Sequence, residues 1–489
     1  MEVKGPADPV ECPLRSAARR FGQTPALIGT NMTMSYARLD RLVDALAYRF
    51  QETGVARGAR VATICPRGWE YVVLLWALFR CESVACPISP RFPSQAISAI
   101  LERIDCRTFI DAGGHSDAIS AAGIRRISLS RLFADLAFER GRPTGGGHFQ
   151  VSGAGGTIVL TSGSFGLPKA VLHRLSSHYF SALGSNRNIA VTPETRWLVS
   201  LPLYHVGGLG IVFRTILGGG AMVIPPSGLA LGDVLEAVPV THLSVVATQL
   251  HRLLKDPPGR EARKRLSAVL VGGGPTGRDL IGEADDRGFP VRTTYGLTEM
   301  ASQVTTTGAN EDKRALSTSG KVLDYRHVKI QDGEILVKGE TLFRGYVSEH
   351  GIHLPVDEEG WFRTGDLGEM DEEGYLTLHG RKDNMFISGG ENIYAEEVEA
   401  SIERLSNVEQ AVVVPVEDPD FGFRPVAFVR FRNGETVTTE EIIEKLEKEL
   451  PRFKIPDAFF DWPAASAGGL KPDRKSLSES ARKRLGKKE

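Results

Sequence analysis

The segment 266–274 reads LSAVLVGGG, a short apolar run followed directly by three glycines. An apolar run of this length is typical of a buried strand, and the glycines end it in a loop. In open α/β sheets, ligands bind beside the loops at the carboxyl ends of the strands. The segment therefore predicts a layered α/β fold in which the loop after this strand lies where ligands bind.

The same alternation of helix and strand recurs through the first two thirds of the chain. Between residues 36 and 50, apolar side chains repeat at helical spacing and share one face: Leu39, Leu42, Val43, Leu46 and Phe50. The apolar run RVATIC (60–65) follows and is typical of a strand. This part of the chain therefore predicts a large layered α/β domain.

The sequence pattern changes after about residue 380. Short β-like runs, QAVVVPV (410–416) and PVAFVRF (425–431), are followed by the helical segment TTEEIIEKLEKEL (438–450). Thr438 and Glu441 have the spacing of a capping box, which marks the start of a helix. A small α+β domain is the natural interpretation of this end of the chain.

Length, composition and charge exclude several classes of protein. A chain of 489 residues is long enough for at least two domains, and a net charge of -1 gives no overall field that would attract nucleic acid. The apolar run YVVLLWALF (71–79) is too short to span a bilayer, so we expect a cytoplasmic protein without membrane insertion. The five cysteines have no histidine at zinc-ligand spacing and predict reduced structural thiols.

The stretch TSGSFGLPKA (161–170) has the composition of a phosphate-binding loop. Hydroxyl groups and glycines allow the main chain to approach an anion, and the lysine adds a positive charge. It is not a Walker motif, because Pro168 precedes the lysine and alanine follows it. On its own, the stretch is weak evidence for nucleotide binding, because a plain polar turn can have the same composition.

Six further motifs follow it in order: LPLYHVGG (201–208), VGGGP (271–275), YGLTE (295–299), RTGDLG (363–368), GRKDNMFISGGENIYAEEVE (380–399) and GGLKPDR (468–474). Together they resemble the acyl-adenylate-forming, or AMP-binding, superfamily of acyl-CoA synthetases, luciferases and adenylation domains. The resemblance implies an ATP-dependent reaction in which a carboxylate forms an acyl-adenylate, after which a thiol displaces AMP. It also implies Mg²⁺ as a cofactor and CoA as a cosubstrate.

The resemblance assigns roles to individual residues. The implied catalytic residues are Lys169 and Thr298 at the phosphates, Glu299 as the Mg²⁺ ligand, and Lys471 at the charge that develops between carboxylate and α-phosphate. Tyr295 would stack on adenine and Asp366 would accept the ribose hydroxyls. The full implied ATP-binding set is Thr161, Ser162, Gly163, Ser164, Gly166, Lys169, Gly272, Gly273, Gly274, Tyr295, Gly296, Thr298, Asp366 and Arg381.

The resemblance further implies two domains that move relative to each other. A multi-subdomain α/β domain would span residues 1–382, and a small mobile α+β domain would span 383–489, with the hinge near Asp383. Gly389 and Gly390 would border the tunnel for the thiol arm of CoA, where the lack of a side chain leaves room.

The longer matches, among them FISGGENIYAEEVE and GGLKPDRKSL, look most like the o-succinylbenzoate-CoA ligases of menaquinone biosynthesis within the superfamily. Such a substrate carries a second carboxylate, and Arg214 in the apolar run LGIVFRTIL is a candidate partner for it. The alternative is an arginine that reaches the surface. The other implied acid-binding residues are His205, Ser185 and Ser302, although an isolated histidine such as His205 is often structural.

Two residues depart from the superfamily pattern: Phe165 replaces the usual threonine and Ala170 the usual glycine. A nucleotide sensor that lost catalysis through this altered loop therefore stays open as an alternative. Two others, another aryl- or acyl-CoA ligase and an adenylation enzyme that serves a carrier protein, stay open as well. The sequence also leaves open whether the chain forms a homo-oligomer.

Overall fold

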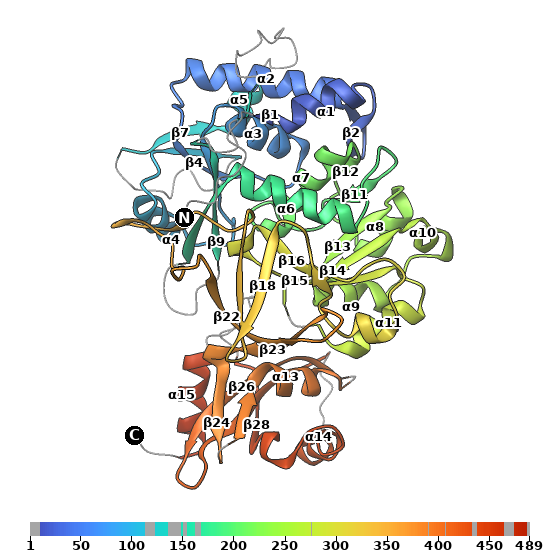
Figure 1. Cartoon of the computed structure of the whole chain (residues 1–489), viewed down its shortest axis with the longest axis vertical. Helices are drawn as coiled ribbons and strands as arrows, with labels where there is room; N and C mark the ends of the chain where they lie inside the picture. The colour runs from blue at the N-terminus through green and yellow to red at the C-terminus, as the bar shows by residue number, and fades with distance from the viewer. Residues whose placement is uncertain are drawn as a thin grey trace.

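The computed structural model describes residues 10–112, 123–134, 148–149, 154–161, 168–274, 276–389, 391–405, 407–432, 438–463 and 474–486. A large part containing α1 to β23 occupies the top and middle of Figure 1, and a smaller part from β24 to α15 lies below it. The predicted α/β class, with a large N-terminal and a smaller C-terminal domain, is confirmed.

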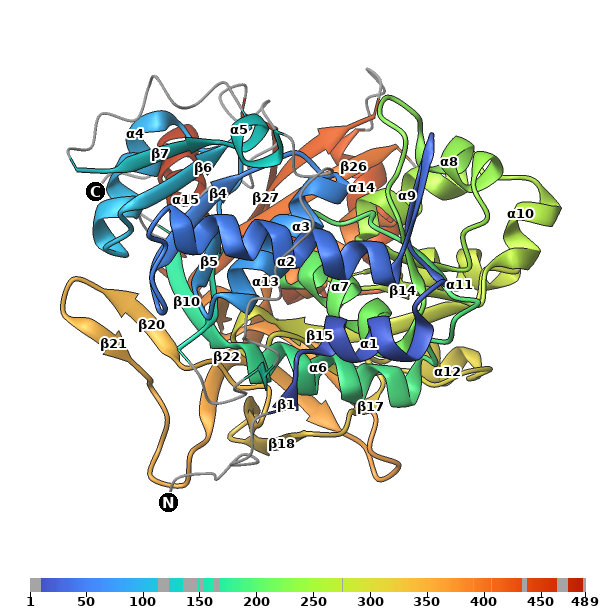
Figure 2. The same cartoon turned by 90° about the horizontal axis from the view of Figure 1, so that it is seen from above.

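The first main sheet, which we call the β9–β10 sheet, mixes parallel and antiparallel strands. Neighbouring strands from β9 to β7 pair in parallel, whereas β10, β20 and β21 are antiparallel at one edge. The β20–β21 hairpin projects away from the body of the molecule in Figure 2. Across the sheet, the strands are β21 (Gly351–His353), β20 (Gly345–Ser348), β10 (Lys169–Arg174), β9 (Gly156–Thr161), β5 (Val84–Pro87), β4 (Arg60–Ile64), β6 (Thr108–Asp111) and β7 (Arg125–Ser128).

The second main sheet, the β14–β15 sheet, is parallel through its centre and antiparallel at its edges. Its strand β14 ends directly before Gly272, as the opening segment predicts. Across the sheet, the strands are β17 (Lys321–Val322), β16 (Ser302–Thr306), β15 (Val291–Leu297), β14 (Ala268–Val271), β13 (His242–Val245), β11 (Arg196–Leu198), β12 (Ala221–Val223), β2 (Pro25–Gly29) and β3 (Met32–Ser35).

Three helices contribute side chains to one hydrophobic core at the junction of these two sheets: α3 (Trp69–Arg80), α6 (Leu175–Asn188) and α7 (Val206–Gly218). Helix α6 contacts β10 of one sheet and β16 of the other, and α7 packs on β12 and β16. The run 71–79 forms the buried part of α3, where Trp76 lies 5.3 Å from Phe213 of α7 between ring centroids. The run is therefore a core helix.

The remaining helices cover the outer faces of the large part. The predicted helix 36–50 is α2, with Leu39, Val43, Leu46 and Phe50 buried as expected. These helices are α1 (Pro13–Phe21), α2 (Tyr36–Glu52), α4 (Ser94–Arg103), α5 (Leu129–Phe133), α8 (Leu231–Ala237), α9 (Ala247–Lys255), α10 (Arg260–Arg265), α11 (Arg278–Asp286) and α12 (Lys313–Leu316). The short strands β1 (Val10–Glu11) and β8 (His148–Phe149) pair with each other.

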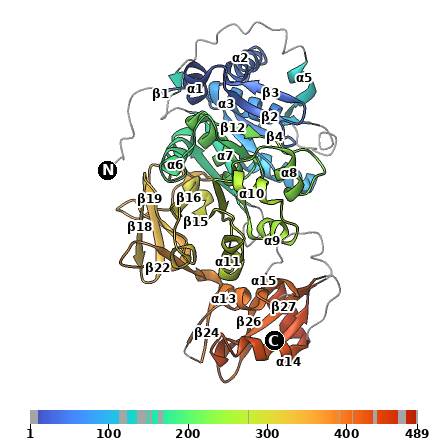
Figure 3. The same cartoon turned by 90° about the vertical axis from the view of Figure 1, so that its right-hand side faces the viewer.

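A third, antiparallel sheet stands beside β15 and β16, above the C-terminal domain in Figure 3. It consists of β18 (Arg326–Gln331), β19 (Glu334–Gly339), β22 (Phe362–Met370) and β23 (Leu376–Arg381). The chain enters the C-terminal domain directly after β23.

The C-terminal domain is built on the hairpin of β26 (Val408–Asp418) and β27 (Gly422–Phe431), which is longer than the short runs the sequence predicts. Both faces of the hairpin are covered by helices: Val413 packs on the side of α13, and Val414 on the side of α15. Helix α14 begins with the predicted capping box of Thr438 and Glu441. The other elements are β24 (Met385–Ser388), β25 (Glu391–Tyr394), β28 (Ala458–Asp461), α13 (Ala395–Glu403), α14 (Thr439–Leu446) and α15 (Arg474–Arg484).

Within the described ranges, no helix has both the length and the apolar character needed to cross a membrane. The five cysteines are free, as expected for structural thiols.

Candidate active site

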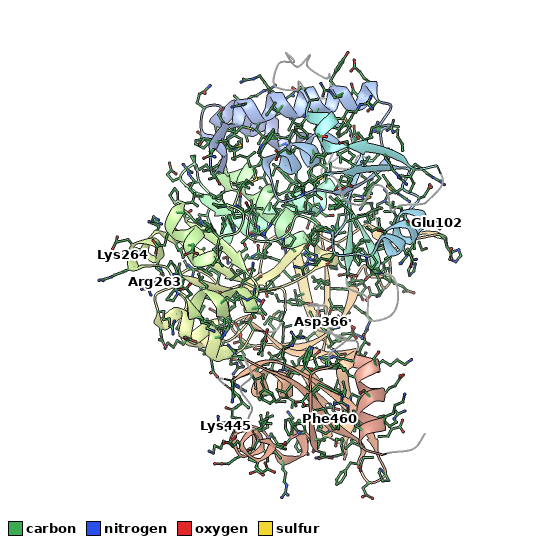
Figure 4. All side chains as sticks on the ribbon, turned by 180° about the vertical axis from the view of Figure 1, so that it is seen from behind. Glu102, Arg263, Lys264, Asp366, Lys445 and Phe460 are labelled. Atoms are coloured by element: carbon green, nitrogen blue, oxygen red, sulfur yellow. The ribbon has the colours of Figure 1, made fainter. Side chains whose placement is uncertain are left out.

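Three of the predicted nucleotide-binding residues meet where the third sheet faces β15. The hydroxyl of Tyr295 donates to Oδ2 of Asp366 over 2.7 Å, and Nη1 of Arg381 donates to Oδ1 over 2.9 Å. Asp366 and Arg381 face each other because β22 and β23 pair in that register. In Figure 4, Asp366 lies close to the level where the large part meets the C-terminal domain.

Burial keeps the Tyr295 phenol neutral. The residue is 6% exposed, and burial, with the charge of Asp366 as the second cause, raises its pKa well above the ordinary value of 10. A neutral phenol can donate to Asp366 and hold that carboxylate in place. The Asp366 oxygens therefore have a fixed direction in the site.

The loop Gly272–Gly274 follows β14, next to β15. A Cβ at Gly272 would lie 2.5 Å from Cγ2 of Thr294, and Gly273 has a φ of +86°, which favours glycine. Gly274 faces open space, with no described atom within 4 Å of an added Cβ. The loop is therefore tight at its start and open at its end.

Thr298 and Glu299 lie on a 3₁₀ turn (Thr298–Met300) that follows β15 directly. The turn ends in two non-glycine residues with positive φ, Ala301 (54°) and Ser302 (116°). Such backbone strain is common at functional sites. Gly296 precedes the turn, where the pairing of β15 with β16 shifts register. The sequence motif predicted Thr298 and Glu299, but it gave no signal for the strain at Ala301.

Tyr346 of β20 connects two of the predicted catalytic residues, and sequence reasoning missed it. Its hydroxyl donates to Oε1 of Glu299 over 2.7 Å, and Nζ of Lys169 lies 5.1 Å from the centre of its ring. Burial and then the charge of Glu299 raise the pKa of Tyr346 above its ordinary value. An isolated tyrosine outside any recognised motif carries no sequence signal for such a position.

The phosphate-loop prediction is only partly visible. Thr161 and Lys169 face each other at the ends of β9 and β10. Ala170 is buried and packs in the hydrophobic core. The other predicted members of the loop lie outside the described residues: Ser162, Gly163, Ser164 and Gly166. Phe165, which departs from the superfamily pattern, lies outside them as well.

Arg214 of α7 is 2% exposed, which excludes the alternative of an arginine that reaches the surface. Its guanidinium carbon lies 5.0 Å from the centre of the Trp197 ring. The Nη1 atom is buried without a hydrogen-bond partner among the described residues. Burial lowers the pKa of Arg214 to about 9. A buried charge of this kind is costly unless an anion joins it.

The other predicted acid-binding residues are spread around α6, α7 and β16. Ser185 is buried and its hydroxyl donates to Oε1 of Gln303 over 2.7 Å, while Ser302 is half-buried on the strained turn. His205 precedes α7 and stays exposed. Partial loss of solvation of the imidazole, and next the charge of Arg91, lower the pKa of His205 below its ordinary value of 6.5. Their roles stay predictions.

On the C-terminal side, Asp383 is exposed and lies 3.5 Å from Nη2 of Arg381. The N–H of Gly389 donates to the carbonyl of Phe421 over 2.9 Å, so this glycine contacts its own domain. Gly390 and Lys471 lie outside the described residues.

The chain matches the family model described as AMP-binding enzyme over residues 14–347, and the model described as AMP-binding enzyme C-terminal domain over residues 397–463. The 2-succinylbenzoate–CoA ligase of Salmonella typhimurium strain LT2 is 34% identical over 460 residues, which cover 94% of this chain and 95% of that protein.

Solved structures of the o-succinylbenzoate coenzyme A synthetase of Bacillus subtilis are also similar. The complex with its acyl-adenylate intermediate is 28% identical with a TM-score of 0.85, covering 96% of this chain and 98% of that chain. The complex with ATP and magnesium ion is 29% identical with a TM-score of 0.85, covering 96% and 100%. Because these matches extend over most of both chains, the chain belongs to the AMP-binding enzyme family.

Proposed function

We propose that the chain is an ATP-dependent acid–CoA ligase that adenylates o-succinylbenzoate and transfers the acyl group to CoA, with release of pyrophosphate and AMP. The observation that carries this substrate is Arg214, a buried guanidinium that lacks an anion among the described residues. Support comes also from the Salmonella relative that bears this ligase name and from the Bacillus structure with its acyl-adenylate.

The chemistry of the acid explains why Arg214 matters. o-Succinylbenzoate has two carboxylates, of which one reacts and the other keeps its charge. That remaining carboxylate can form a charge-assisted hydrogen bond with the unpartnered Nη1 of Arg214. The indole of Trp197, which lies beside the guanidinium, offers an aromatic wall next to the charge.

In the first step, a carboxylate oxygen attacks the α-phosphorus of ATP, and the bond to pyrophosphate breaks. Asp366 accepts the ribose hydroxyls, and the bonds from Tyr295 and Arg381 fix its direction. Lys169 and the loop that begins at Thr161 bind the outer phosphates, and Thr298 contacts the α-phosphate. Lys471 stabilises the negative charge that develops during attack.

The residues around Glu299 fit a bound Mg²⁺. Oxygen ligands suit this ion, and the Glu299 carboxylate is held in place by the hydroxyl of Tyr346, on the same turn as Thr298. When bound, Mg²⁺ neutralises charge on the phosphates. Glu299 is the residue that would hold it.

In the second step, the sulfur of CoA attacks the acyl carbon, the thiol proton is lost and AMP leaves. We infer that residues 383–489 rotate about Asp383 relative to residues 1–382, and that Gly389 and Gly390 then border the thiol arm of CoA. The proposed hinge lies between the two ranges that match the family models. A cytoplasmic location, where ATP and CoA are available, belongs to the same proposal.

The test measures AMP and thioester from the purified chain with ATP, Mg²⁺, CoA and o-succinylbenzoate, in parallel with benzoate and fatty acids. We expect the highest kcat/KM for o-succinylbenzoate. A higher value for a fatty acid would show that the proposed substrate is wrong. Exchange of pyrophosphate into ATP without CoA isolates the first step, and a catalytically inactive nucleotide sensor would show none.

A further inference from the structure

A second buried arginine, Arg326 at the start of β18, lies next to the proposed acid pocket and is 3% exposed. Its guanidinium donates to neutral acceptors: Nε to the carbonyl of Gln303 (2.6 Å), Nη1 to the carbonyl of Asp324 (2.6 Å), and Nη2 to the carbonyl (3.0 Å) and hydroxyl (3.1 Å) of Ser181. Among the described residues, no carboxylate forms an ion pair with it. Arg326 is therefore a buried positive charge that only dipoles hold in place.

The surrounding chain fits closely around this side chain. A Cβ at Gly184 of α6 would lie 2.3 Å from Nη1 of Arg326 and 2.5 Å from the carbonyl oxygen of Asp324. A side chain at Gly184 would collide with the guanidinium, so helix α6 has a glycine where Arg326 crosses it. The position of Arg326 is thereby fixed.

Arg326 also connects α6 with the strained turn after β15. Ser181, which accepts from Nη2, donates its hydroxyl to the carbonyl of Ala301 over 2.9 Å. Gln303, whose carbonyl accepts from Nε, accepts the hydroxyl of Ser185 on the same helix. These bonds hold α6 against the segment Ala301–Gln303. The two together form the pocket wall, which carries two of the predicted acid-binding residues, Ser185 and Ser302.

The charge of Arg326 acts on the same region as that of Arg214. Burial, and next the charge of Arg214, lower the pKa of Arg326 to about 9. The charge of Asp324 raises this pKa, but the Asp324 carboxylate pairs with Arg187 at the surface. Helix α6 joins the two sites directly, because Nδ2 of Asn186 donates to the carbonyl of Arg214 over 3.0 Å. Two fixed positive charges thus share one buried region.

We propose that Arg326 is a positioning residue that selects doubly charged acids: its fixed charge adds to that of Arg214, and its hydrogen bonds hold the pocket wall around the acid. Each of its three nitrogens already donates to a carbonyl or hydroxyl oxygen of the protein. In this proposal Arg326 therefore acts through its electric field and through the pocket wall that it holds, and not as a direct ligand of the acid. This inference rests on the proposed function, since it needs an acid that keeps a second negative charge.

The test compares kcat/KM for o-succinylbenzoate with kcat/KM for 3-benzoylpropionate, which has one carboxylate. We expect Arg326→Met to lower the ratio of the two values by about tenfold, because loss of one nearby charge weakens attraction for the dianion more than for the monoanion. Arg326→Lys keeps the charge and is expected to retain most of the ratio. The KM for ATP should stay unchanged in both variants.

A matched control is Arg292→Met, which removes another buried arginine, from β15, whose Nη1 donates to the carbonyl of Val291. It should leave the ratio unchanged, whatever its effect on the melting temperature. If Arg326→Met does not fold, Arg326→Gln replaces it, since an amide can keep one of the hydrogen bonds.

The outcomes separate this inference from the proposed function. If the parent chain does not ligate o-succinylbenzoate, the proposed function fails. If it does, and the ratio in Arg326→Met or Arg326→Gln equals that of the parent, the inference about Arg326 is overturned. Equal loss of the ratio in the lysine and methionine variants would also overturn it, because the charge would then play no part.

Discussion

On the nucleotide side of the candidate site, which comprises Tyr295, Asp366, Arg381, Glu299 and Tyr346, the polar groups bind one another. On the acid side, the buried guanidinium groups of Arg214 and Arg326 form no ion pair with any described carboxylate. The nucleotide side is thus ordered by internal hydrogen bonds before ATP arrives. The acid side keeps a positive charge that an anionic substrate can neutralise, so the two sides should respond differently to mutation and to pH.

The largest effect is expected from Asp366→Ala. It removes the proposed ribose acceptor and leaves Tyr295 and Arg381 without their shared partner. Loss of the two proposed bonds to the ribose hydroxyls, at about 1.5–3 kcal/mol each, corresponds to about 10³-fold in kcat/KM for ATP. The KM for o-succinylbenzoate should change little. Steady-state kinetics check both values. Asp371→Ala is the control, because Asp371 directly follows β22, the strand that carries Asp366, and its carboxylate pairs with Arg314. A loss that fell equally on both substrates would contradict the separation of the two sides.

Arg214→Leu is the reciprocal experiment. Loss of a charge-assisted bond to the second carboxylate, about 1.5–3 kcal/mol, should raise the KM for o-succinylbenzoate by about 10- to 100-fold and leave the KM for ATP unchanged. Leucine suits the buried, apolar surroundings of α7, so the fold should persist. Equal KM values for the acid in variant and parent would exclude the proposed role of Arg214.

The same comparison shows which parts of the site a sequence can reveal. Tyr295, Asp366 and Arg381 each fall within a contiguous motif, and strand pairing brings two of them together. Tyr346 and Arg326 could not be predicted. The partners of Tyr346 lie on distant segments, and those of Arg326 include main-chain carbonyls, which leave no residue pattern.

For the fold, apolar periodicity predicted α2, and a short apolar run ending in glycines predicted strand β14, because each packs one continuous segment into a core. The length of the β26–β27 hairpin was underestimated, because the apolar runs mark only its middle, while polar residues such as Glu417, Asp418 and Arg424 continue the two strands toward the turn. The register of the sheets depends on contacts between distant segments and was not predictable from local patterns.

The two sides should also differ in their response to alkaline pH. Burial lowers the pKa of Arg214 and of Arg326 to about 9, so the charged forms that attract the acid are lost as the pH rises through 9. Above that pH, the KM for o-succinylbenzoate should rise by about tenfold per pH unit for each group that must be protonated. On the nucleotide side, the pKa of Tyr295 is raised, so its phenol stays neutral and the KM for ATP should stay level. Parallel pH profiles for the two substrates would contradict this difference.

Tyr346→Phe tests whether internal hydrogen bonds order the nucleotide side. The variant keeps the ring beside Lys169 and removes the bond to Glu299, which should lower the rate of adenylation by about tenfold or less and raise the Mg²⁺ concentration needed for half-maximal rate. Tyr375→Phe is the matched control. It removes a similar bond, in which the Tyr375 hydroxyl donates to Glu311 over 2.6 Å, but neither residue belongs to the candidate site. An unchanged Mg²⁺ dependence in Tyr346→Phe would show that this bond does not order Glu299.

The smallest effects come from the loop Gly272–Gly274, where two substitutions of the same size differ in their surroundings. In Gly272→Ala, the new methyl group would meet Thr294, whose hydroxyl is held by Thr305 and Thr306 over 2.6 and 2.9 Å and cannot move aside easily. The loop must then shift, and we expect a KM for ATP raised about three- to tenfold, because only part of the overpacking cost of about 1–3 kcal/mol falls on ATP binding and the rest lowers the stability of the fold. In Gly274→Ala the methyl group enters open space, so the KM for ATP and the melting temperature should match those of the parent. Equal effects of the two alanines would show that the loop is not tightest at Gly272, and that the order of the nucleotide side does not extend to this loop.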